Sequence, residues 1–195
     1  MGAAVNDLRH FDNSTDNVQP VFDFRLQLRN STRPEHDATE CIFDPFLNDP
    51  VHKLGWYLAA QRSGLAALFA GQEPVAVLCA TIVPDLINRL DHDLHQMGLH
   101  HIPVETFGAI DPIACDYLVL GSRLGTEVIR RKIFGSATNH MIPTYFQANF
   151  DTNVWRLHCS VLDQIDPTTT RAQQIINDVK RGFNLFETAA RSQQD

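Results

Sequence analysis

Apolar residues recur along the chain with the spacing of amphipathic helices, and Asp-Pro pairs mark where several helices are expected to begin. Asp49-Pro50, Asp111-Pro112 and Asp166-Pro167 each precede a long stretch of helical periodicity. An Asp side chain caps the free amides of a first turn, and a Pro in the next position loses no hydrogen bond there. Glycines stand where these stretches stop, as expected of helix carboxyl ends: Gly71, Gly98 and Gly135.

Apolar residues at three- and four-residue intervals predict a series of helices after residue 49. The predicted helices span residues 50–70, 74–97, 112–134, 142–163 and 167–191. Pro84 is expected to kink or split the second of these, and a break is expected near Asp151 in the fourth. No internal repeat interrupts the pattern. The sequence therefore predicts a single all-α domain over residues 19–195, preceded by a polar tail over residues 1–18.

The first element is ambiguous in the sequence. Residues 21–28 alternate between apolar and polar side chains, which by itself is typical of a strand. Thr32 and Glu35 have the spacing of a capping box, which would begin a helix only at Arg33. No second segment shows a comparable alternation, so we expect an extended lead-in followed by a helix.

Composition and charge narrow the class of protein. The formal net charge of the 195 residues is −7, which argues against a nucleic-acid-binding protein because phosphate contacts need clustered Lys and Arg. No apolar run has the length of a membrane helix, and the amino terminus lacks the pattern of a signal peptide. Four cysteines are widely spaced, without a Cys-x-x-Cys pair, and are expected to be reduced and mostly buried. These features predict a cytoplasmic globular protein.

The first candidate site lies in residues 28–40. If this segment is helical, Arg29, Arg33 and His36 share one helix face. A neutral imidazole with two cations beside it suits a ligand that has a metal centre and carboxylate arms. The alternative is a histidine that makes an ordinary hydrogen bond, with solvated arginines next to it.

The second candidate lies in residues 117–132, where Gly121 and Gly125 stand one turn apart in an apolar helix. Each glycine costs about 1 kcal/mol of helix stability relative to Ala, so a pair on one face indicates a close approach or a bend. A flat macrocycle against that face would use both properties. The alternative is a close contact between two helices.

Together the two segments resemble the proximal and distal haem helices of the haem oxygenase family. Leu28-Arg29-x-x-Thr32-x-x-x-His36, followed by Glu40, is similar to the proximal pattern. Gly121-Ser122-Arg123-Leu124-Gly125 resembles the distal glycine segment of the forms found beside bacterial phytochromes. The resemblance covers about residues 26–190. It includes FQANFDTNVWRLHCSVL and VKRGFNLFE, which are similar to the family's last two helices.

The resemblance implies a mostly antiparallel helical bundle that clamps haem between its first and fourth major helices. His36 would be the axial ligand of the iron, and Gly121, Ser122 and Gly125 would form the distal, catalytic side. The propionates would meet Arg29, Arg33 and Lys180, with Tyr117 as a further pocket contact. The implied activity opens haem to biliverdin, carbon monoxide and iron. It uses O2 and electrons from a ferredoxin or a flavin reductase, and the product implies a link to a phytochrome pathway.

Three residues depart from the family pattern. Ser122 stands where some members have an Asp that holds the catalytic water network, Thr126 follows Gly125 where a smaller residue is common, and Pro34 lies close to His36. If Pro34 breaks the helix, Arg29 leaves the haem face. Two other functions therefore stay open: a non-catalytic haem- or bilin-binding protein, and a helical scaffold without a tetrapyrrole. A di-metal oxygenase is disfavoured because paired Glu-x-x-His motifs are absent from the sequence.

Further polar clusters have competing interpretations. Asp91, His92 and His95, completed by His100 or His101, have the residue types of a transition-metal site, although a solvated helix end explains them as well. The predicted helix over residues 112–134 ends on a basic run of Arg130, Arg131 and Lys132. This run either docks an acidic electron donor, together with Arg123, or simply interacts with the negative pole of its own helix dipole. Three isolated histidines and both tryptophans are expected to be structural: His52, His140, His158, Trp56 and Trp155.

Overall fold

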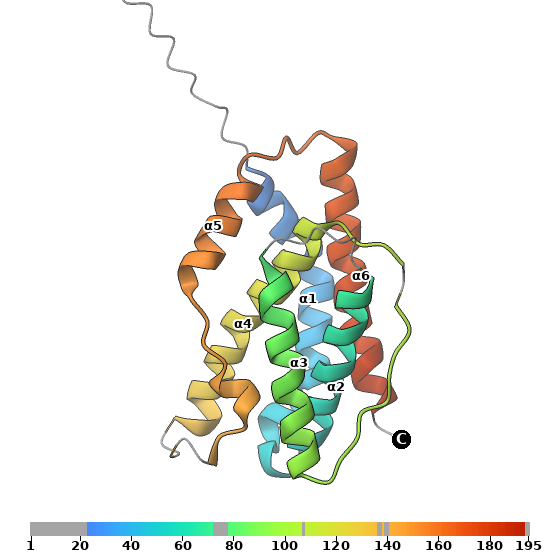
Figure 1. The fold of residues 1–195 in the computed structure, drawn as a ribbon. Helices are drawn as coiled ribbons and strands as arrows, with labels where there is room; N and C mark the ends of the chain where they lie inside the picture. Colours follow the sequence, from blue (N-terminus) through green and yellow to red (C-terminus); the bar gives the residue numbers. More distant parts are fainter. Residues whose placement is uncertain (1–22, 72–77, 107, 136–137, 139–140, 194–195) are drawn as a thin grey trace, which may run out of the picture.

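The computed structural model describes residues 23–71, 78–106, 108–135, 138 and 141–193, and in these residues the secondary structure is helical, without a β-strand (Figure 1). This confirms the predicted all-α class. The predicted tail lies outside the described residues. The elements are α1 (Phe24–Asn48), α2 (Pro50–Ala70), α3 (Cys79–Gln96), α4 (Pro112–Phe134), the short 3-10 helix η2 (Thr144–Gln147), α5 (Thr152–Leu162) and α6 (Thr170–Ser192).

Two of the three Asp-Pro pairs begin helices as predicted. The Asp49 carboxylate accepts the amide of His52 at the start of α2, and the Asp111 carboxylate accepts the amide of Ile113 at the start of α4. The third pair does not. Asp166 instead binds the amide of Thr168 in a turn, and Thr169 caps α6, which therefore begins at Thr170 rather than at residue 167.

The expected extended lead-in before α1 is wrong, because the helix begins at Phe24 and continues through Pro34 and Pro45. Phe24, Leu28 and Thr32 are four residues apart and buried, so they form one inward stripe of a helix. The Thr32 hydroxyl donates to the Leu28 carbonyl oxygen at 2.9 Å and does not cap a later helix start. Pro34 therefore leaves Arg29, Arg33 and His36 on one continuous helix.

The predicted second and fourth helices after α1 also change in detail. α3 runs through Pro84 without being split there, and its predicted first residues, 74–77, lie outside the described residues. The predicted helix over residues 142–163 consists of two pieces, η2 and α5. The break lies where it was expected, since the Asp151 carboxylate accepts the amide of Asn153 and so begins α5.

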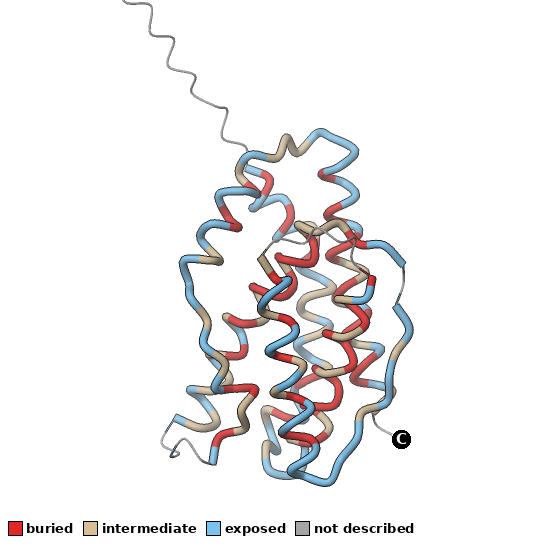
Figure 2. The backbone as a smooth tube through the Cα atoms, viewed as in Figure 1, coloured by how far each residue is buried: buried red, intermediate tan, exposed pale blue. Residues whose placement is uncertain are grey.

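The last of the described helices, α6, packs against α1, α2 and α4 (Figure 1). Small residues permit close contacts there: Gly64 of α2 faces the ring of Phe186, and Gly182 of α6 faces Leu118. Figure 2 shows buried residues along the inward faces of α2 and α6 and exposed residues outside. α3 covers α2 and η2, and α5 packs mainly on α4. No described helix is long and apolar enough to cross a membrane.

Helix directions decide which residues of α1 and α4 come to the same level. α1 and α2 are antiparallel, but α1, α4 and α6 run in the same direction (Figure 1). The contacts agree, since Glu35 pairs with Lys180 and, one turn later on α1, Thr39 donates to the Phe183 carbonyl oxygen. The expectation of a mostly antiparallel bundle thus holds for the neighbours of α2 and not for α1, α4 and α6.

Candidate functional site

His36 lies in the middle of α1 with its side chain 44% exposed, and it meets α6 through an edge-to-face contact with Phe183. Its Nδ1 atom is 3.3 Å from Asp37 Oδ1 and 3.7 Å from Glu40 Oε2. The hydrogen bond from Arg33, aided by His36, lowers the pKa of Asp37, which keeps that carboxylate charged. When a carboxylate accepts the proton on Nδ1, the free lone pair of the neutral imidazole is on Nε2. In this tautomer Nε2 can bind an iron.

The glycine face of α4 borders open space. A Cβ atom on Gly121 would have Trp155 of α5 as its nearest neighbour, at 3.9 Å, and a Cβ atom on Gly125 would meet nothing within 4 Å among the described residues. The alternative of a close helix–helix contact at these glycines is therefore not what the structure has. Close contacts of that kind occur at Gly64 and Gly182 instead.

Tyr117 fixes the relative level of α1 and α4. Burial raises the pKa of its hydroxyl, while a hydrogen bond with Thr32 and the charge of Arg29 act in the opposite direction, so Thr32 of α1 lies beside Tyr117. His36 follows Thr32 by four residues, and Gly121 follows Tyr117 by four. Because α1 and α4 run in the same direction, both lie one turn, about 5.4 Å, further along. His36 and Gly121 therefore lie at about the same level.

A cluster of rings from α4 and α5 closes one side of this region. The ring centroids of Tyr117, Trp155 and His158 are 5.8 to 6.3 Å apart. His158 is 1% exposed, burial lowers its pKa against the opposing charge of Asp116, and its Nε2 atom has no hydrogen-bond partner among the described residues. The sequence pattern predicts only structural roles for Trp155 and His158. Because Trp155 is far along the chain from Gly121, the sequence carries no signal that it lies next to that glycine.

The three cations expected to meet carboxylates differ in their surroundings. Arg29 is exposed, and its charge acts on the Tyr117 hydroxyl by lowering its pKa. Arg33 is paired with Asp37 at 2.7 Å, and Lys180 of α6 is paired with Glu35 of α1 at 3.2 Å. The structure thus brings Lys180 of α6 next to the helix of His36. A ligand carboxylate would have to replace Asp37 or Glu35 as the partner of Arg33 or Lys180.

The hydroxyl groups beside the glycines are bound to their own helix. Ser122 Oγ donates to the Val119 carbonyl oxygen, and Thr126 Oγ1 donates to the Ser122 carbonyl oxygen, each at 2.8 Å. Thr126 is also buried, and so it is not a group on the open glycine face. In this arrangement neither hydroxyl donates a hydrogen bond into the space above Gly121 and Gly125.

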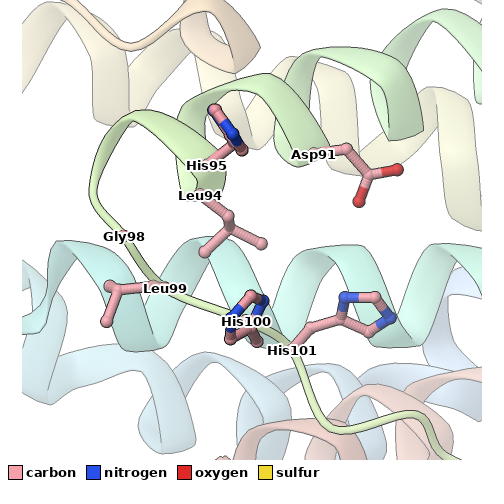
Figure 3. Close-up of a pocket in the computed structure, with 7 residues that line it drawn as sticks. All are labelled: Asp91, Leu94, His95, Gly98, Leu99, His100 and His101. Atoms are coloured by element: carbon pink, nitrogen blue, oxygen red, sulfur yellow. The ribbon is translucent and has the colours of Figure 1, made fainter.

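The predicted metal site near residues 91–101 is not assembled. Asp91, His95, His100 and His101 line an open pocket of about 480 Å³, with His95 on α3 and the other two histidines on the following segment (Figure 3). Arg62 holds Asp91 at 2.8 Å. Among the described residues, the donor atoms that approach within 4.8 Å of one another as a group of three belong to a different set: His36, Asp37 and Glu40.

The other predicted polar residues have simple partners. Arg130 and Arg131 both bind Glu127, at 2.8 and 2.7 Å, so the basic run at the end of α4 is partly neutralised within its own helix. His52 pairs with Asp49, and the Trp56 indole donates to the Ala190 carbonyl oxygen. His140 lies outside the described residues. Docking of an electron donor at this basic run stays a prediction.

Comparisons with known protein families, with curated proteins and with solved structures found no match to this chain. A functional assignment therefore rests on the residues and geometry described above.

Proposed function

We propose that the protein is a haem oxygenase, which opens haem to biliverdin, carbon monoxide and iron with O2 and electrons from a redox partner. The observation that carries the proposal is that His36 of α1 and the open glycine face of α4 lie at about the same level. That level follows from the hydrogen bond of Tyr117 with Thr32 one turn earlier. A flat ligand between the two helices would then meet an imidazole on one side and bare backbone on the other.

The residues present fit a haem in their donor chemistry. The carboxylates of Asp37 and Glu40 beside Nδ1 orient the His36 ring, and this leaves Nε2 as the ligand atom. Arg29, Arg33 and Lys180 supply positive charge for the propionates. Bound haem would supply both the iron that activates O2 and the macrocycle that is opened. The role of the protein is to hold that macrocycle and to leave space beside Gly125. The rings of Tyr117 and Trp155 would cover one edge of the macrocycle.

A second candidate is a non-catalytic haem- or bilin-binding protein with the same site. It is favoured by the hydroxyl groups of Ser122 and Thr126, which are bound to carbonyl oxygens of α4 and hold no polar network on the glycine face. Such a protein would bind the tetrapyrrole for storage, delivery or sensing without opening it.

One spectroscopic experiment separates these functions. Haem is added to the purified protein, followed in air by ascorbate or by a reductase–ferredoxin pair. For the enzyme we expect a Soret band that decays into the broad absorbance of biliverdin. A Soret band that persists favours the binding protein, and the absence of any Soret band contradicts both.

A matched pair of histidine variants tests the ligand assignment. His36→Ala removes the proposed iron ligand from a half-exposed position, so the fold should persist while turnover is lost. His52→Ala is the control, because this histidine is exposed and pairs with Asp49 at the start of α2. Circular dichroism checks the fold of both. Unchanged turnover in His36→Ala would refute the ligand role of His36.

A further inference from the structure

Two thiols from different helices meet in the core, away from the glycine face. Cys79 is the first residue of α3, and Cys115 lies in the first turn of α4. Their Sγ atoms are 3.4 Å apart, and both side chains are fully buried. The two sulfur atoms of a disulfide are about 2.05 Å apart, so an approach of about 1.4 Å would bring these two to bonding distance.

The surroundings of Cys79 suppress its acidity. The hydrogen bond with Cys115, burial and the nearby Asp116 carboxylate raise the pKa of the Cys79 thiol well above its usual value. Asp116 is itself buried and accepts the Cys79 amide at 2.8 Å. Since the thiolate is the reactive form, the pair should react slowly while the protein is folded. The raised thiol pKa slows oxidation of the pair, but it does not change the stability of a disulfide once it has formed.

The position of Cys79 permits the small movement that bonding requires. The first amides of a helix have no partner within that helix, and the amide of Cys79 is held by the side chain of Asp116. A shift of this residue toward α4 therefore keeps its amide on Asp116 and breaks no hydrogen bond that this amide makes within α3. Two sulfurs held in contact also face each other at a far higher effective concentration than thiols on separate molecules.

We propose that Cys79 and Cys115 are a modification site, at which a peroxide converts the two thiols into a disulfide that joins α3 to α4. The first thiol takes one oxygen atom from the peroxide and becomes a sulfenic acid, and the peroxide O–O bond breaks. The second thiol displaces that oxygen as water, forms the S–S bond and gives its proton to the departing oxygen. With hydrogen peroxide, two thiols lose two electrons, and two waters form in all.

This site is independent of the proposed haem chemistry, and its test needs no haem. The reduced full-length protein is treated with graded hydrogen peroxide. It is then denatured in acid with a thiol-blocking reagent and digested with trypsin without reductant. The sequence places the four cysteines on four separate tryptic peptides, with Cys79 on residues 63–89 and Cys115 on residues 90–123. We expect these two peptides to appear cross-linked, with a mass two hydrogens below their sum.

The other cysteines provide internal controls. Cys41 is exposed and should be oxidised first, at lower peroxide concentration or earlier time than the cross-link. Cys41→Ser should leave the cross-link unchanged, whereas Cys115→Ser should abolish it. The wild-type digest decides the question even if Cys115→Ser fails to fold. The cross-linked protein should also show a higher thermal midpoint, because the bond restricts the unfolded chain.

Two results would overturn the proposal. One is that Cys79 and Cys115 are both still fully blocked by the reagent when Cys41 has been completely oxidised and the peroxide exposure has been extended to hours. The other is a dominant cross-link that involves Cys41 or Cys159, which would show that oxidation follows unfolding rather than the 3.4 Å contact.

Discussion

The open space beside Gly125 makes an unusual prediction, in which stability and ligand binding change in opposite directions. Gly125 lies in α4 with a normal helical backbone, is exposed, and has no neighbour within 4 Å of a Cβ atom among the described residues. Gly125→Leu should therefore gain helix propensity without a steric cost. The expected gain in the free energy of unfolding is roughly 0.5–1 kcal/mol, which is about 1–4 °C in thermal midpoint for a chain of this size.

Haem affinity should fall in the same variant. If the macrocycle lies against the glycine face, a Leu side chain occupies part of its space. Overpacking of this kind typically costs about 1–3 kcal/mol, which corresponds to a roughly 5- to 150-fold larger dissociation constant for haem. Gly125→Ala adds a single carbon and should show the same gain in stability with a smaller loss of affinity.

Thermal unfolding followed by circular dichroism measures the first effect, and titration of the Soret band measures the second. The reasoning fails if Gly125→Leu is more stable and still binds haem as tightly as the wild type, because the space beside Gly125 would then not be the haem site. A loss of stability would show instead that the glycine face is packed against part of the chain.

Two further predictions concern packing and charge away from the proposed haem site. Gly64→Ala, a matched substitution in α2, should destabilise the protein by about 1–2 kcal/mol, because its Cβ atom would overlap the Phe186 ring; a chemical denaturation midpoint equal to that of the wild type would contradict this packing. The hydrogen bonds of Arg130 and Arg131 lower the pKa of Glu127 from 4.5 to about 2. A carboxylate with a depressed pKa in the folded state adds stability above pH 4.5 and loses it as the pH falls toward 2. Glu127→Gln should therefore have a lower free energy of unfolding than the wild type at pH 7, by about 0.5–1 kcal/mol given the exposure of the pair. This difference between the variant and the wild type should vanish near pH 2. A difference that stays constant between pH 7 and pH 2 would exclude the charge of Glu127 as its source.

Where the local chemistry of a boundary is strong, the sequence predicts the fold well. Asp49-Pro50 and Asp111-Pro112 mark the starts of α2 and α4 to the residue, because each carboxylate has an amide of the first turn to accept. The start of α1 was missed because Phe24, Leu26 and Leu28 alternate with polar residues. In the helix Phe24 and Leu28 are buried, whereas Leu26 is 47% exposed. Tertiary burial along a four-residue period overrides that short alternation.

The candidate site was predictable only in part. The shared helix face of Arg29, Arg33 and His36 was expected only if residues 28–40 were helical throughout, and the structure has them on one helix. Lys180 of α6 meets that helix at Glu35, a pairing that the sequence did not predict. The contacts of Trp155 with Gly121 and of Cys79 with Cys115 join different helices at large sequence separations, and no local pattern records them. The carboxylate partners that already occupy Arg33 and Lys180 were likewise invisible without coordinates.

The packing of α6 has a consequence for how the protein is made. This helix leaves the ribosome after α1, α2 and α4, yet it packs against all three. Until it arrives, the small residues and apolar stripe that receive it, including Gly64 of α2 and Leu118 of α4, have no partner. The growing chain must therefore keep an apolar surface exposed until α6 has been synthesised, because the bundle closes only with contacts as distant in sequence as that of Thr39 with Phe183.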